Sequence, residues 1–305
     1  LIAGDPSGDL LAAELVGLEA DAAANLIWGR QIRYIGVGAM LIGGLWSLWS
    51  LRKSLLSGVK TGMALRGASM IGVPDTERDL PMTMIMSGIV LFVLPLFALY
   101  YVVVDSLGIA FTMAVIMVVA GFVFSSVSGY MAGLVGSSNN PVSGITISTI
   151  LFASLILLAI MGAGSTVGPV AAIMIGAVIC NAAAIAGDNL QDLKAGQLIG
   201  ATPWRQQVML GIGALASAAV MAPVLNLLLE AYGIGTPARE GVNALAAPQA
   251  MLMASVASGI FGGGLPWNMV AIGAVVGAIV ITLDEWRKRT GRSWRAPVLA
   301  VADGI

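Results

Sequence analysis

Histidine is absent from all 305 residues, which removes the usual switch near neutral pH and the commonest metal ligand. Any proton relay in the chain would therefore use carboxylates. Catalytic arrangements that need histidine, such as Ser-His-Asp, Cys-His and HExxH, are excluded, so we expect no enzyme activity. The one cysteine, Cys180, forms no disulfide within the chain. Because there is no cysteine or histidine cluster with ligand spacing, we expect no bound metal ion and no cofactor.

Charge is also scarce. Charged residues make up 10% of the chain and hydrophobic residues 58%, whereas soluble domains carry about a quarter charged residues. Five stretches contain no charged residue at all, namely 34–51, 80–104, 106–187, 206–229 and 241–283. A membrane crossing needs about 20 apolar residues, so these stretches accommodate roughly seven or eight hydrophobic segments. The sequence predicts an all-α integral membrane protein, a polytopic helical bundle.

Two parts of the chain differ in composition. Residues 1–33 mix acidic and apolar residues, and we expect them to form a polar N-terminal loop or a surface helix. Residues 34–305 form the predicted membrane domain. The chain begins at Leu1 rather than Met and stops at Ile305, where a new apolar stretch begins. We therefore expect a fragment of a larger membrane domain.

A polar block interrupts the longest uncharged stretch. Residues 129–146 read GYMAGLVGSSNNPVSGIT. Asn140 is suited to cap a helix, and Pro141 to occupy its first position, where a missing N–H costs nothing. A helix that starts there would point its positive end at whatever occupies the gap.

The positions of the basic residues, together with the number of apolar segments between them, predict a broken or re-entrant element. If the apolar pieces 246–260 and 268–283 both crossed the membrane, the basic run that follows, Arg287 to Arg295, would lie outside, against the positive-inside bias. One apolar piece must then enter and leave on the same side. The SSNNPVSG break and the piece from Pro248 to Pro266 are both candidates. Irregular backbone at membrane depth is tolerated where protein or a water-filled cavity surrounds it, so either choice indicates a channel or transporter.

Two helical patterns flank the polar block. Gly121, Ser125, Gly129 and Gly133 recur every four residues, a spacing typical of close helix packing, with direct substrate contact as the alternative. Asn181, Asp188 and Asp192 share one helix face if the helix continues through Gly187. Nearby Lys194 and Arg205 place this segment on the cytoplasmic side. It is either a gate or coupling element, or a solvated helix that simply carries charge.

Three stretches resemble a known family. They are GLVGSSNNPVSGITI (133–147), CNAAAIAGDNLQDLKAGQLIGATPWRQQ (180–207) and IRYIGVGAMLIGGLWSL (32–48). All three resemble the oligopeptide transporter family, which includes the yellow stripe-like metal-chelate carriers, and specifically the C-terminal half of bacterial members. The resemblance implies proton-coupled secondary active uptake of small peptides or peptide-like metal chelates, by alternating access in a bacterial inner membrane. Any metal would then travel as a chelate.

The resemblance also suggests where a substrate would bind. We expect a mid-membrane site lined by polar residues of the interruption, with Asn181 as a second contact; the residues of the interruption are Ser137, Ser138, Asn139, Asn140 and Ser143. Asp188 and Asp192, with Lys194, are the candidates for proton coupling or gating. The rival interpretation is that the Asn-Asn-Pro block only caps a broken helix.

The expected partners follow from the same interpretation. They are an oligopeptide or metal-chelate substrate, the lipid bilayer, the remaining half of the transporter and, in a homo-oligomer, further copies of the chain, with no nucleic acid. A passive channel and a non-transporting membrane scaffold are the alternative functions.

Overall fold

The computed structural model describes residues 20–64, 73–239, 241 and 243–289. This part of the chain is mainly helical and contains no strand. In chain order the elements are α2 (Ala20–Ile27), η1 (Trp28–Ile32), α3 (Arg33–Ala64), η2 (Asp75–Glu77), α4 (Met82–Val104), α5 (Leu107–Val135), η3 (Ser137–Asn139), α6 (Val142–Met161), α7 (Gly168–Ile199), α8 (Pro203–Ala231), α9 (Pro248–Gly262) and α10 (Trp267–Arg289). Of the predicted N-terminal segment 1–33, residues 20–33 are described, and they lead without a break into α3.

Seven helices in the described part of the chain are long and apolar enough to cross a membrane. They are α3 with η1, α4, α5, α6, α7, α8 and α10. Together with α9, which is apolar but shorter, they account for the predicted seven or eight hydrophobic segments. The protein is therefore a polytopic all-α membrane protein.

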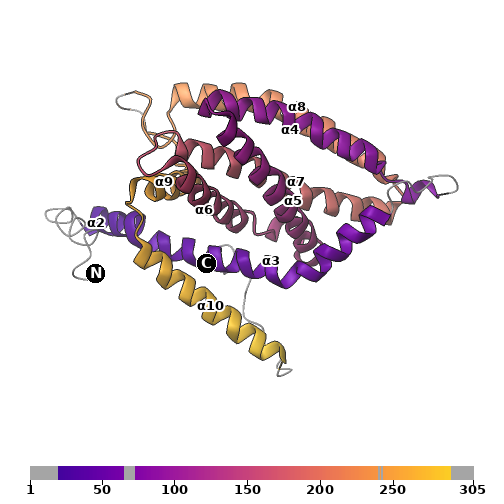
Figure 1. Cartoon of the computed structure of the whole chain (residues 1–305), viewed down its shortest axis with the longest axis horizontal. Helices are drawn as coiled ribbons and strands as arrows, with labels where there is room; N and C mark the ends of the chain where they lie inside the picture. The colour runs from indigo at the N-terminus through magenta and orange to yellow at the C-terminus, as the bar shows by residue number, and fades with distance from the viewer. Residues whose placement is uncertain (1–19, 65–72, 240, 242, 290–305) are drawn as a thin grey trace.

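The helix α6 runs through the centre of the bundle (Figure 1). Its apolar stretch is 61% buried, against 6% for α4 and none for α8. The helices α3, α5, α7 and α9 pack around it. The helices α4 and α8 lie at the periphery of the bundle (Figure 1), and most of their apolar surface is available to lipid or to another protein.

The helix α9 begins and ends at the same end of the bundle. Near its start, the Pro248 carbonyl accepts a hydrogen bond from the Arg33 guanidinium, at the start of α3. Near its end, the Phe261 carbonyl accepts one from the Gly164 N–H, in the loop between α6 and α7, at 3.0 Å. Its 15 residues span about 22 Å, short of a hydrocarbon core of about 30 Å. The piece from Pro248 is thus the one that does not cross, whereas the SSNNPVSG break joins two crossing helices.

This topology divides the basic residues unevenly. We call the end that holds α9 the α9 end and the opposite one the basic end. The basic end carries, among the described side chains, Arg52, Lys53, Lys60, Arg78, Lys194, Arg205 and Arg287. The α9 end carries Arg30, Arg33 and Arg239. Since α9 does not cross, the end of α10 lies with the other basic segments, and the conflict with the positive-inside bias disappears.

Glycines allow two helix pairs to approach closely. A Cβ placed on Gly38 of α3 would lie 1.9 Å from the Val270 carbonyl oxygen, and one on Gly273 of α10 would lie 1.9 Å from the Ile35 carbonyl oxygen. Between α5 and α7, a Cβ on Gly129 would lie 2.7 Å from a methyl group of Leu190. The expected packing role of the glycine ridge is confirmed at Gly129, but the same ridge has open space at Gly133.

We expect Gly38→Ala to destabilise the protein, because the new methyl group would collide with backbone atoms of α10 that cannot move aside. Overpacking of this kind costs at least about 1–3 kcal/mol. The measurement is the thermal midpoint of the full-length protein in detergent. Gly88→Ala in α4, where a Cβ meets no atom within 4 Å, is the matched control and should leave the midpoint unchanged or raise it. Equal effects of the two substitutions would contradict the close crossing.

The topology is tested with single cysteines in a Cys180→Ser background. Thr236→Cys before α9 and Gly264→Cys after it should react with a membrane-impermeant thiol reagent from the same side. Thr76→Cys at the basic end should react only from the opposite side. Labelling of positions 236 and 264 from opposite sides would show that α9 crosses.

Candidate functional site

The polar block forms the turn between α5 and α6, residues 136–141. The turn starts at Gly136, whose φ of +85° is a conformation that favours glycine. One 3-10 turn, η3, and Pro141 follow before α6 begins at Val142. The Ser137 N–H donates a hydrogen bond to Gln191 Oε1 of α7 at 2.9 Å. The turn is therefore attached to α7 as well as to the two helices that it joins.

Asn140 points into the contact between α5 and α7. Its Nδ2 donates a hydrogen bond to the Ser128 hydroxyl of α5. That hydroxyl, which is fully buried, donates in turn to the Ala183 carbonyl of α7. In a medium without water these partners matter, since a buried polar group without a partner costs about 1–3 kcal/mol. The chain Asn140–Ser128–Ala183, which we call the amide clasp, connects three helices.

Gly187 makes room for the clasp. A Cβ at this position would lie 2.7 Å from Asn140 Nδ2 and 3.5 Å from Ser128 Oγ. A larger residue at position 187 would therefore push the amide away from the hydroxyl. The donor therefore lies in the turn before α6, the acceptor on α5 and the space on α7.

The prediction that Asn140 caps α6 is wrong. The residue directly before the helix is Pro141, and no side chain caps it. The amide of Asn140 instead finds its partner on α5, because the buried Ser128 hydroxyl offers an acceptor that would otherwise face an apolar interface. Asn140 Oδ1 is buried and has no hydrogen-bond partner among the residues that the structure describes.

The turn lies at the basic end of the bundle. The helix α6, with 20 residues, covers about 30 Å, which is a whole hydrocarbon thickness. The turn at its start is therefore about that far from the α9 end. Beside it, a space of about 10 Å³ is lined by Gly44, Ser47, Phe124, Val127, Pro141, Gly144 and Ile145. That volume is about enough for one water and far too small for a peptide.

The other predicted residues of the turn contribute less. Ser137 and Ser143 are partly buried, and Ser138 is exposed. The side chain of Asn139 lies outside the part that the structure describes. Asn140, through its side chain, and Ser137, through its backbone, have hydrogen bonds that tie the turn to neighbouring helices.

The predicted residues of α7 lie on its opposite face. The helix continues through Gly187 to Ile199, and Asn181, Asp188 and Asp192 are all exposed, on a face turned away from buried Ala183 and Gly187. The Asn181 amide donates to the Ala177 carbonyl of its own helix at 3.0 Å. Asn140 and Asn181 therefore do not meet within this chain.

Lys194 is exposed too. Its Nζ donates to Gln197 Oε1, one turn further along α7, at 2.9 Å. The lysine thus has a local partner on the outside of the basic end. Its predicted role in gating stays a prediction.

Ser128, Gly187 and Gln191 are functional residues that the sequence alone does not single out. Ser128 directly precedes Gly129 but lies outside the four-residue spacing of the small-residue ridge. In the sequence Gly187 looks like a possible break in a helix, whereas in the structure its missing side chain makes room for Asn140.

Comparison with known proteins identifies the family. The family described as OPT oligopeptide transporter protein matches residues 18–305. The chain belongs to this family. The resemblance seen in the polar block and in α7 is thereby confirmed.

Among the described residues, no group of three or more acidic, cysteine or histidine side chains is arranged to hold a metal ion.

A curated relative of this OPT family member comes from Haemophilus influenzae and is named "Putative oligopeptide transporter". It is 36% identical over 94% of the chain, and the match covers 50% of the relative. The chain thus spans about half the length of that relative. No solved structure matches the chain.

Removing the central hydroxyl of the amide clasp tests its contribution. We expect Ser128→Ala to destabilise the protein by about 1–3 kcal/mol, because the Asn140 amide loses its buried acceptor. The matched control is Ser126→Ala on the same helix, where the hydroxyl is exposed and donates to the Phe122 carbonyl at 2.7 Å. Urea or thermal unfolding in detergent provides the comparison. If the two variants unfold alike, the clasp does not contribute to stability.

Proposed function

We propose that the protein is part of a secondary active transporter that takes up small peptides or peptide-like metal chelates, coupled to protons, by alternating access. Membership of the OPT family supports a transporter. The observation that carries the proposal is the amide clasp, a polar connection between three helices inside a membrane bundle. A bundle made only of independent crossings has no need for buried polar side chains, which cost stability unless they are paired.

The clasp lies where an alternating-access protein needs a closed end. It joins α5, α6 and α7 beside a space of about 10 Å³, so no peptide passes there in this arrangement. Opening this end would break the hydrogen bond between Asn140 and Ser128 and free an amide for substrate. On this proposal Asn140 is both a closing contact and a substrate contact, and Ser137, Ser138, Asn139 and Ser143 line the opened turn.

The exposed face of α7 is the proposed wall of the path. Asn181 lies 13 residues after the start of α7 at Gly168, which places it about 20 Å along the helix and near mid-membrane. A polar side chain is unfavourable against lipid at that depth, so this face suits a cavity or another protein segment. Asp188 and Asp192 continue the face toward the basic end and are the proposed coupling carboxylates.

The same face suggests where the rest of a transporter packs. The curated relative is about twice as long as the part matched here, and α8 has no buried residue within this chain. We place the equivalent of the unmatched half against α8 and the polar face of α7. Further copies of the whole protein are a separate proposal, as is the orientation in a bacterial inner membrane with the basic end in the cytoplasm.

The test is uptake of peptide and metal-chelate libraries by vesicles that contain the full-length protein. Under an imposed proton gradient we expect accumulation above the external concentration and its loss with an uncoupler. Asn140→Ala and Asn181→Ala should each lower uptake at normal folded amounts, whereas Asn226→Ala should not, because this exposed amide pairs with Glu230 at 3.0 Å on α8.

Other outcomes would contradict parts of the proposal. Equilibration without accumulation indicates a passive channel. If the variants Asp188→Asn and Asp192→Asn both accumulate substrate as the wild type does, these carboxylates do not couple uptake to protons. No movement of any solute indicates a scaffold.

A further inference from the structure

We propose that the groove between α3 and α10 binds an anionic phospholipid, with an acyl chain in the groove and the head group at Arg52 and Lys53. The groove has a volume of about 600 Å³ and is lined by Ile42, Leu45, Trp46, Trp49, Ala278, Ile281 and Thr282. This volume falls within the range of small-molecule sites, roughly 300–1,000 Å³. The site is separate from the amide clasp and from the proposed transport path.

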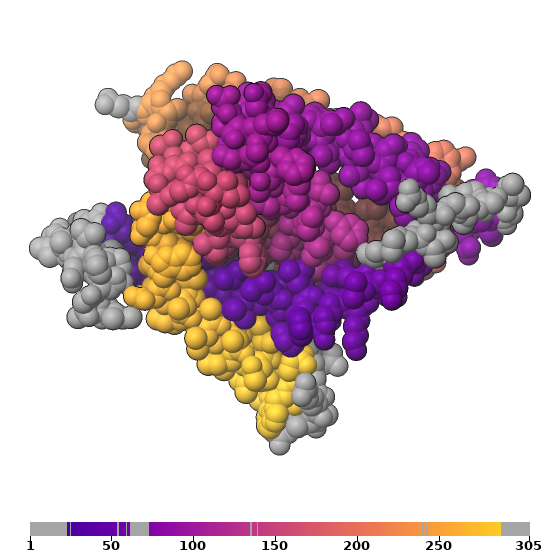
Figure 2. Space-filling model, viewed as in Figure 1, coloured from indigo at the N-terminus to yellow at the C-terminus, as the bar shows by residue number. Residues whose placement is uncertain are grey.

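The shape of the groove follows from the glycine crossing. The helices α3 and α10 run in the same direction and touch backbone to backbone at Gly38 and Gly273. From that point they diverge toward the basic end (Figure 1), and the groove opens between them. At the outer edge of the bundle (Figure 2), α10 packs mainly on α3.

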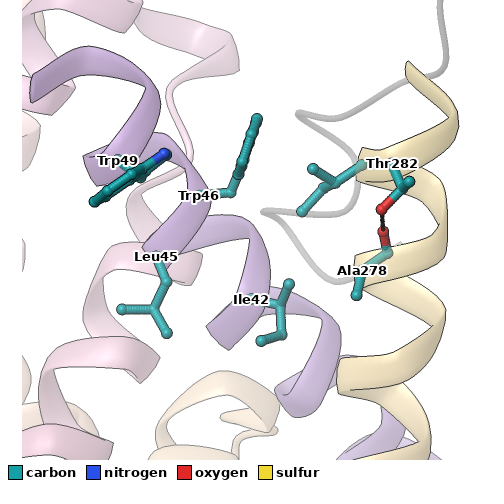
Figure 3. Close-up of a pocket in the computed structure, with 7 residues that line it drawn as sticks. Ile42, Leu45, Trp46, Trp49, Ala278 and Thr282 are labelled. Carbon is teal, nitrogen blue, oxygen red and sulfur yellow. Dashed lines mark hydrogen bonds between the residues drawn. The ribbon is translucent and has the colours of Figure 1, made fainter. Parts of the chain in front are cut away.

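The lining suits hydrocarbon rather than peptide. In Figure 3, Ile42 and Trp46 of α3 lie across the opening from Ala278 and Thr282 of α10. Thr282 is the one lining residue with a hydroxyl, and its Oγ1 donates to the Ala278 carbonyl at 2.7 Å within its own helix. An extended peptide in this groove would leave its backbone groups without partners, whereas an acyl chain has none to satisfy.

The positive charge at the opening of the groove favours an anionic head group. Lys53 lies on the face of α3 that lines the groove, one turn beyond Trp49. The Arg52 guanidinium lies 4.1 Å from the centre of the Trp49 ring. Tryptophan belongs at the depth of lipid head groups, and basic residues there attract anionic lipid.

The acidic residues on the facing helix present little negative surface beside this opening. Asp284 follows the groove on α10 and is only 2% exposed, and Glu285 is partly buried. The exposed charges next to Trp49 are Arg52 and Lys53, both positive.

The experiment titrates detergent-purified full-length protein with dioleoyl phosphatidylglycerol or dioleoyl phosphatidylcholine, which share their acyl chains, and follows the thermal midpoint. We expect phosphatidylglycerol to raise the midpoint by several degrees more than phosphatidylcholine. The double variant Arg52→Gln, Lys53→Gln should lose at least half of that difference. Arg205→Gln should keep it, because this arginine also lies over a tryptophan, Trp204, at 5.5 Å, but at the start of α8, away from the groove.

A second variant separates the acyl chain from the head group. Ala278→Phe fills the groove and should reduce stabilisation by both lipids while the protein still folds. The proposal is overturned if the wild type shows no head-group preference, or if the double variant keeps the whole preference. It is also overturned if Ala278→Phe lowers stability without lipid and leaves the lipid response unchanged, since the occupant would then be another protein segment.

Discussion

The hydrogen bond from the Asn140 amide to the buried Ser128 hydroxyl connects the start of the central helix α6 to its neighbours at the basic end of the bundle. It fixes the start of α6, the most buried helix, against α5, and the same hydroxyl reaches the Ala183 carbonyl of α7. Because lipid offers no competing partners, each of these groups depends on the others for its hydrogen bond. The missing side chain at Gly187 is part of the same arrangement, since a Cβ there would displace the amide.

The distribution of basic residues is a second constraint, and it limits how many of the apolar segments can cross the membrane. With seven crossings and with α9 returning to the end from which it started, the described basic residues at the end of α3, before α4, at the end of α7 and at the end of α10 share one end. A crossing at α9 would have separated the last of these from the rest. The end closed by the amide clasp is also this basic end, so the positive-inside bias and the proposed gate concern the same side of the membrane.

Much of the fold follows from the sequence because it depends on composition. Charge-free stretches of sufficient length indicate the crossing helices, and the parity of the basic run from Arg287 indicates one piece that returns. Periodicity likewise places Asn181, Asp188 and Asp192 on one face of α7, as the structure shows. The sequence does not show which stretch enters and leaves on the same side, the SSNNPVSG break or the piece from Pro248. Both have enough apolar residues and the helix-breaking residues that such a turn needs.

The candidate site was harder to predict, because it depends on contacts between distant residues. Asn140 before a proline looks like a helix cap, and the local sequence does not reveal that a buried serine 12 residues earlier will compete for its amide. Asn140 and Asn181 look like two contacts of one site, yet Asn140 packs against the Gly187 face of α7 and Asn181 lies on the opposite, exposed face. The crossing of Gly38 with Gly273 joins helices 235 residues apart, a distance over which no local pattern carries information.

The central claim is that Asn140 and Ser128 act together, and a double-mutant cycle tests it most directly. The free energy of unfolding would be measured for wild type, Asn140→Ala, Ser128→Ala and the double variant in the same detergent. A direct hydrogen bond predicts that the two losses are not additive, with a coupling energy of about 0.5–3 kcal/mol. Additive losses would contradict the claim, because the two side chains would then contribute independently.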